Sequence, residues 1–185
     1  MEKQYALAEK INDASAMSGD LGAMGNILFE AGKYNEALAK YEKSLQLIIA
    51  SNLSTEVKTN AKRFYLYNVA RVALQQGDLK TAKAKSEEFR AQAEAVKNNF
   101  QIWLAYEVAG MIALAEKHHD KALEHFQRAN QQNPYTLYRQ ALAYEAKGEA
   151  AKAKAAYQKA AEWNALNNLN YAFMRNKAKE KLAML

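Results

Sequence analysis

A short motif recurs four times along the chain and constrains its fold more than any other feature. In each copy a tight turn is followed, five residues after its first position, by an alanine. These alanines are Ala37, Ala82, Ala122 and Ala153. Four residues later an aromatic ring stands in three copies, as Tyr41, Phe126 and Tyr157, and Ser86 takes its place in the second. Because residues spaced by four lie on one stripe of a helix, each motif predicts a helix that begins at the turn.

A second small residue lies seven positions before each turn. The four residues are Gly25, Ala70, Gly110 and Ala141. We expect each of them to mark the close contact between a first helix and the helix that follows the turn. A pair of antiparallel helices cannot bury its apolar face alone, so successive pairs stack on one another. The chain is therefore predicted to be a stack of helical hairpins.

Composition supports an all-helical chain. Only 7 glycines and 1 proline occur among 185 residues, too few turn-forming residues for a sandwich or a barrel. There is no cysteine, which excludes disulfides, thiolate metal sites and cysteine nucleophiles. The spacing predicts helices over 2–16, 19–31, 34–50, 54–76, 79–97, 99–116, 119–131, 134–147, 150–163 and 167–183.

This pattern resembles the tetratricopeptide repeat (TPR) family, and the copies around Gly25 and Gly110 match it best. The resemblance covers roughly residues 18–165. It implies an all-α, right-handed superhelical solenoid of about four repeats with terminal capping helices, in one domain over 1–185. The predicted parts are an N-terminal helix at 1–17, repeats at 18–53, 54–98, 99–133 and 134–165, and a C-terminal capping helix at 166–185.

Three features depart from the family pattern. The turns are 45 residues apart from 32 to 77, 40 from 77 to 117 and 31 from 117 to 148, whereas the family repeat has about 34. Lys117 replaces the turn glycine, and because a left-handed conformation costs a side chain about 1–2 kcal/mol, we expect that turn to be remodelled. Phe89 stands where the other copies have small residues, so we expect the second copy to pack in its own register.

The residue pattern favours recognition over catalysis. His118 and His119 lie on a turn, and His125 is six residues further on, a spacing that does not place it on the same helix face as His119. We therefore expect no metal site, and His119 takes the aromatic turn position that Tyr34 holds in the first copy. No phosphate-binding loop, nucleophile elbow or zinc-protease motif occurs, so we expect no enzyme activity and no cofactor.

The resemblance implies that first helices line a concave groove. The candidate partner-binding residues are Asn26, Phe64, Tyr67, Asn68, Arg71, Glu107, Met111, Tyr135, Tyr138 and Arg139. Large rings beside amides suit an extended peptide, because rings give contact area at little entropy cost and amides bond the peptide backbone. Phe64 and Tyr67 could instead pack within the long second repeat. Gly22, Leu104 and Val108 stand where the family's carboxylate clamp has cations, which argues against a terminal carboxylate as the ligand.

The leading hypothesis is a non-catalytic scaffold that binds a protein or peptide partner, as a monomer or weak homo-oligomer. One alternative is self-assembly through the terminal helices at 2–16 and 167–183. Another is RNA binding through residues 149–185, which hold seven lysines and arginines against three glutamates, although we do not expect nucleic acid as the partner. No segment is long and apolar enough to span a membrane, and a soluble chain could be cytoplasmic or periplasmic after removal of a leader.

Overall fold

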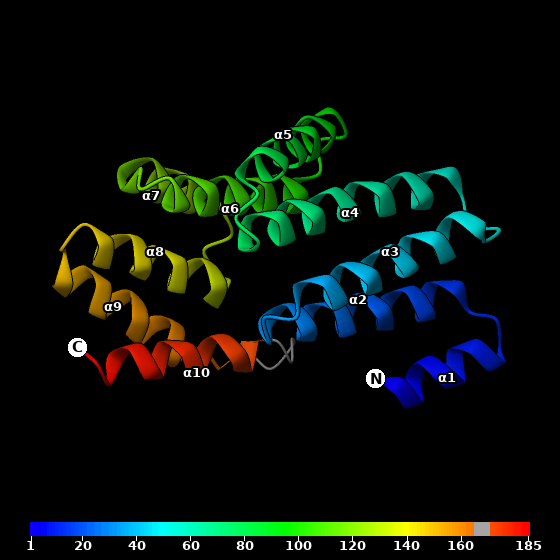
Figure 1. Cartoon of the computed structure of the whole chain (residues 1–185), viewed down its shortest axis with the longest axis horizontal. Helices are drawn as coiled ribbons and strands as arrows, with labels where there is room; N and C mark the ends of the chain where they lie inside the picture. The colour runs from blue at the N-terminus through cyan, green and yellow to red at the C-terminus, as the bar shows by residue number, and fades with distance from the viewer. Residues whose placement is uncertain (165–170) are drawn as a thin grey trace. The chain divides into compact units, whose positions relative to one another are not determined.

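The computed structural model describes residues 1–164 and 171–185 and confirms the all-helical prediction. These residues form ten helices and no strand (Figure 1). The helices are α1 (Glu2–Lys10), α2 (Ala14–Glu30), α3 (Tyr34–Ala50), α4 (Thr55–Gln75), α5 (Leu79–Ala95), α6 (Asn99–Ala115), α7 (His119–Arg128), α8 (Pro134–Ala146), α9 (Ala150–Ala161) and α10 (Tyr171–Leu182). None of these helices is long and apolar enough to cross a membrane.

The chain divides into two compact units, Met1–Gln92 and Ala93–Leu185. The first contains α1 to α4 and most of α5, and the second contains α6 to α10. Each unit is built from antiparallel helix pairs that stack, as the repeated motif predicts. The single domain and its repeat boundaries stay a prediction.

The first unit is centred on the pair α2 and α3. Its core joins Phe29 of α2, Ala37 and Tyr41 of α3 and Val72 of α4. In the second repeat the aromatic Phe89 of α5 is fully buried, and its ring lies 5.6 Å from that of Tyr67 in α4. The second repeat thus packs through Phe89, the ring three residues beyond the usual position, as its sequence predicts.

In the second unit, an aromatic ring of the second helix packs against a glycine of the first helix. A Cβ atom added to Gly110 of α6 would lie 2.5 Å from Cε1 of Phe126 in α7. The following pair, α8 and α9, buries Ala141, Ala153, Tyr157 and Ala160 in one cluster. The small first-helix residue is therefore the point of closest approach, as predicted.

The last helix, α10, packs on α9 and α8. The sequence predicts a helix from 167, but positions 165–170 lie outside the described residues and the described helix begins at Tyr171. Met174 and Ala178 are buried, whereas Lys179 is exposed, so α10 covers the preceding pair with its apolar stripe. Lys181 Nζ binds Glu145 of α8 at 2.9 Å, and the hydroxyl of Tyr157 donates a hydrogen bond to the same carboxylate.

The turn at Lys117 is not remodelled, contrary to expectation. Lys117 adopts φ 62°, close to the φ of +77° and +81° at Gly32 and Gly77. Equivalent backbone hydrogen bonds close the turns at Lys117 and at Gly32. One runs from His118 N to Ala113 O and the other from Lys33 N to Leu28 O, each at 2.9 Å. Packing of the flanking helices therefore outweighs the cost of a left-handed lysine.

The prediction of one helix over 2–16 is wrong. α1 ends at Lys10, Asn12 adopts φ 53°, and Asp13 caps the next helix by accepting a hydrogen bond from Ala16 N at 2.9 Å. An aspartate at this position satisfies an amide that has no partner inside the helix, which fixes the start of α2 at Ala14. The predicted start at 19 is therefore five residues late.

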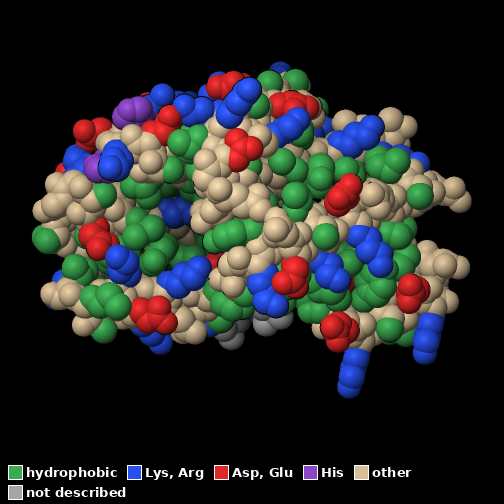
Figure 2. Space-filling view, in the orientation of Figure 1, with side chains coloured by type: hydrophobic (Ala, Val, Ile, Leu, Met, Phe, Trp, Pro, Cys, Tyr) green, Lys and Arg blue, Asp and Glu red, His purple; other side chains and the backbone are tan. Residues whose placement is uncertain are grey.

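The surface carries no single dominant charge on the face that Figure 2 shows. Lysine and arginine side chains are interspersed there with acidic and apolar ones. Some basic residues of the chain are paired, as Lys147 is with Asp120 at 2.6 Å and with Glu149 at 2.7 Å. Such an arrangement is typical of a solvated surface.

Candidate functional site

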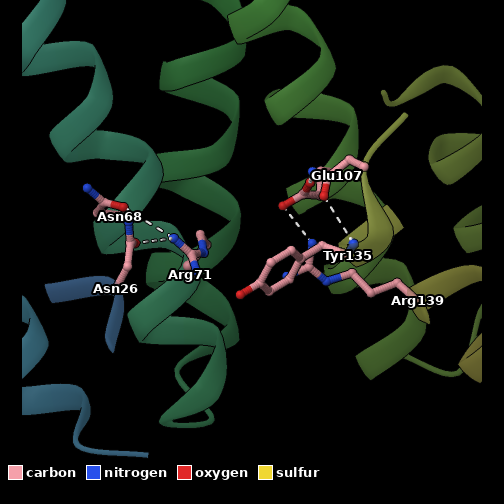
Figure 3. A network of polar contacts seen from close by, with 7 residues as sticks. Asn26, Asn68, Arg71, Glu107, Tyr135 and Arg139 are labelled. Carbon is pink, nitrogen blue, oxygen red and sulfur yellow. Dashed lines mark hydrogen bonds and ion pairs between the residues drawn. The ribbon is translucent and has the colours of Figure 1, made fainter. Parts of the chain in front are cut away.

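In the first unit, two successive first helices bring polar predicted residues together (Figure 3). Arg71 of α4 donates from Nη1 to Oδ1 of Asn26 in α2 and to Oδ1 of Asn68, each at 3.4 Å. The hydroxyl of Tyr41 donates to the same oxygen of Asn26 at 2.8 Å. Asn26 therefore links α2, α3 and α4 through a single side-chain oxygen.

The Arg71 guanidinium lies between aromatic rings. Its central carbon is 4.2 Å from the ring centroid of Phe29 and 5.1 Å from that of Tyr67. The Arg71 side chain is only 7 % exposed, so the neighbouring rings and amide oxygens, rather than water, stabilise its positive charge. Burial raises the pKa of Tyr41, and the positive charge of Arg71 opposes that shift.

Phe64 and Tyr67 differ in their surroundings. Tyr67 is buried beside Phe89, as the packing alternative expects, whereas Phe64 is half-buried on α4. Asn26 and Asn68 are also half-buried. Among the five candidate residues of this unit, Phe64, Asn26 and Asn68 are therefore more accessible than Tyr67 and Arg71.

In the second unit the predicted residues centre on a buried ion pair (Figure 3). Arg139 Nη1 of α8 lies 2.6 Å from Oε1 of Glu107 in α6, and both side chains are nearly inaccessible. Asn133 Nδ2 donates to the other oxygen of Glu107 at 3.3 Å. Asn133 also caps α8 by accepting from Tyr135 N at 3.0 Å.

Aromatic side chains surround this ion pair. The Arg139 guanidinium lies 5.4 Å from the ring of Tyr135, whose centroid is 6.2 Å from that of Tyr171 in α10. Burial raises the pKa of Tyr171, and the Glu107 carboxylate raises it further. Tyr171 is absent from the predicted site residues, because the segment 166–185 that contains it is predicted only as a capping helix. α6, α8 and α10 thus contribute to one face.

The other predicted residues of this unit are unequal in accessibility. Tyr138 is half-buried, and its ring lies 5.5 Å from that of Tyr157. Met111 is buried, and Val108, which groove geometry would place beside it, is fully buried. Val108 therefore belongs to the core. The ten predicted residues divide evenly between the two units, and a continuous groove stays a prediction.

Both clusters consist of amide groups, guanidinium groups and aromatic rings, which form hydrogen bonds and stacking contacts. The histidines lie elsewhere: His125 stacks on Tyr106 at 6.2 Å, and His118 lies 4.0 Å from Glu116. Among residues 1–164 and 171–185, no three histidine or acidic side chains are grouped as metal ligands would be.

Comparison with known families matches residues 134–165 to the model described as Tetratricopeptide repeat. The segment comprises α8 and α9 and has the same bounds as the predicted fourth repeat, although the sequence pattern ranks the first and third copies nearest to the family. No curated protein matches the chain. The match supports the resemblance to the tetratricopeptide repeat family over residues 134–165, and the other helix pairs of both units stack in the same way.

Proposed function

We propose that the chain is a non-catalytic scaffold that holds a peptide or a partner's helix against its first helices, α2, α4, α6 and α8. Proteins with this repeat are generally non-catalytic, and protein binding is typical of them. The inner face of each first helix is the stripe that carries the ten candidate residues. The fold alone supports only the binding of a protein in general. That the guest lies on the inner faces of the first helices is the more specific part of the proposal.

One observation carries the proposal: in each unit, residues from successive first helices converge. Asn26 of α2 meets Asn68 and Arg71 of α4, and Glu107 of α6 meets Arg139 of α8. Side chains fixed by such contacts lose little freedom when a guest binds, which favours affinity. Half-buried groups beside them, Asn68 and Tyr138, offer an amide and a ring to the guest.

A random peptide library displayed on phage tests this function. We expect panning on the purified chain to enrich peptides whose binding is weakened by Asn68→Ala and by Tyr138→Ala. Tyr144→Ala is the matched control for the second variant, since Tyr144 is also half-buried on α8 and packs against the same core cluster, but its spacing of six residues from Tyr138 places it on another side of the helix. Helical circular dichroism of each variant shows that the fold is kept.

Two outcomes would contradict the function. The library could yield no enriched peptide, or the enriched peptides could bind the Asn68 and Tyr138 variants as tightly as the unaltered chain. Peptides that lost affinity only for Tyr144→Ala would place the binding surface outside the inner faces.

A second function, self-association through α1, is favoured by two exposed side chains. Leu7 is 63 % exposed and Ile11 is 68 % exposed, and their spacing of four residues places them on one stripe. In α10, in contrast, Met174 and Ala178 are buried and Phe173 and Leu182 are half-buried within their own unit. Light scattering at high protein concentration tests this function: a dimer that disappears in Leu7→Ser/Ile11→Ser supports it, and a strict monomer contradicts it.

A further inference from the structure

The last helix, α10, places an aromatic side chain beside the first helices of the second unit. The ring of Tyr171, the first residue of α10, lies 6.2 Å from the ring of Tyr135 in α8. Besides burial, the carboxylate of Glu107 in α6 raises the pKa of Tyr171, so this charge is also close to the ring. The first turn of α10 therefore lies where α6 and α8 meet.

This place is also part of the surface on which a guest of the second unit is proposed to lie. Tyr135 and Glu107 are candidate residues of that surface, and Arg139 links them. Its Nη1 lies 2.6 Å from Glu107 Oε1, and its guanidinium lies 5.4 Å from the Tyr135 ring. A guest on α6 and α8 and the ring of Tyr171 therefore compete for the same space.

Few buried side chains hold α10 in this position. Of its 12 residues, Met174 and Ala178 are buried, whereas α9, which has the same length, buries three alanines and the large side chain of Tyr157. Segments with few buried apolar contacts open locally at a lower cost in free energy than the whole domain. We therefore expect α10 to open while α8 and α9 stay folded.

The polar contacts of α10 are also weak. Lys181 Nζ lies 2.9 Å from Glu145 Oε1, but the two side chains are 32 % and 36 % exposed. Arg175 Nη1 donates to the backbone oxygen of Trp163 at the long distance of 3.4 Å. Ion pairs that are this exposed to water contribute little to stability.

The charges of α10 favour opening as well. Arg175 and Lys179 are spaced by four residues, and so are Lys177 and Lys181, while Glu180 is the one acidic residue of the helix. Like charges at this spacing destabilise a helix. Unwinding of α10 relieves that repulsion.

Resting on the function proposed above, we propose that α10 is an autoinhibitory helix of the second unit. In the docked state its first turn, with Tyr171, occupies the inner surface of α6 and α8, and a guest binds there only after α10 has opened. The apparent affinity for the guest is then the intrinsic affinity reduced by the fraction of open molecules. Changes that loosen α10 without touching the first helices therefore strengthen guest binding.

The test measures the affinity of those library peptides that Tyr138→Ala weakens, because such peptides bind the second unit. Lys181→Met removes one contact that holds α10, so we expect the affinity to rise by about twofold to fivefold. Lys179→Met removes the same charge from the exposed side of α10 and is the matched control. It should leave the affinity unchanged.

Tyr171→Ala distinguishes a ring that excludes the guest from a ring that binds it. If Tyr171 excludes the guest, the alanine variant should bind the peptides about twofold to tenfold more tightly, since the ring contacts that hold α10 are lost. Weaker or unchanged binding by Tyr171→Ala would overturn the inference. So would equal effects of Lys181→Met and Lys179→Met.

Hydrogen–deuterium exchange without any peptide gives a second test. We expect the amides of α10 to exchange faster than those of α9, and faster still in Lys181→Met, with no change in α8 and α9. Equal exchange rates in α10 and α9 would overturn the inference whichever peptides the library yields.

The outcomes also separate this inference from the function on which it rests. If library peptides bind with the same affinity to the unaltered chain and to both Lys181→Met and Tyr171→Ala, or bind only the first unit, the inference fails and the general function stands. If no library peptide binds, both fail.

Discussion

Gly25 of α2 lies against the ring of Tyr41 in α3 so closely that a Cβ atom at this position would be 2.5 Å from Cε1 of the ring. Gly110 and Phe126 have the same relationship in the second unit. A glycine in a first helix thus makes room for a ring in the second, and this pair sets how closely the two helices pack.

Replacing Gly25 by alanine should lower the free energy of unfolding by about 1–3 kcal/mol, because a buried ring must shift to make room. Tyr41 cannot shift freely, since its hydroxyl is bonded to Asn26 at 2.8 Å. Gly22→Ala, one turn earlier in α2, meets nothing within 4 Å and should stabilise by roughly 0.5–1 kcal/mol. Urea denaturation of both variants measures the difference, and equal effects would contradict the packing described.

Replacing Lys117 by glycine should stabilise the chain by about 1 kcal/mol, because the left-handed φ of 62° strains a residue with a Cβ atom. Gly148→Ala, at φ 77°, is the matched reverse change and should destabilise. Thermal unfolding checks both. A loss of stability in Lys117→Gly would show that the lysine side chain contributes more than the strain costs.

Removing one partner of the buried Glu107–Arg139 pair should cost about 3–5 kcal/mol, because the other charge is then left in the interior. We expect Glu107→Leu to be the least stable variant. The double variant Glu107→Leu/Arg139→Met should recover part of the lost free energy of unfolding. A double-mutant cycle by chemical denaturation measures the coupling. Additive losses would mean that the two residues do not interact.

The cover formed by α10 should loosen in acid. The hydrogen bond from Tyr157 holds the pKa of Glu145 below its ordinary value, with Lys181 acting in the same direction. Because the folded pKa is lowered, this stabilisation is complete above roughly pH 5 and is lost as pH falls through the folded pKa. Glu145→Gln should therefore be less stable than the unaltered chain near pH 7, by on the order of 0.5 kcal/mol for a partly exposed group. A stability difference that persisted at pH 2 would contradict this assignment.

The repeated spacing was sufficient to predict most of the helices. Small residues and rings at fixed intervals, such as Ala153 and Tyr157, report directly on helix pairing, so the start of α9 and its packing followed from them. The break between α1 and α2 was missed although two residues mark it: Asn12 adopts the left-handed φ of 53° after α1, and Asp13 caps α2.

Burial of the polar candidates could not be predicted from periodicity. The pattern places Arg71, Glu107 and Arg139 on the inner side of their helices, but it does not tell whether a side chain ends in solvent or on a partner. Arg71 meets Asn26 across 45 positions, a contact that depends on how two hairpins stack. Tyr171 was missed for the same reason, since its neighbour Tyr135 belongs to another helix.

The central claim is that first helices hold the guest, and hydrogen–deuterium exchange with a library-selected peptide tests it most directly. Amides gain protection where a bound guest restricts local opening. We predict added protection in α2 and α4 or in α6 and α8, with little change in α3, α7 and α9. Protection confined to α1 or to those second helices would contradict the claim.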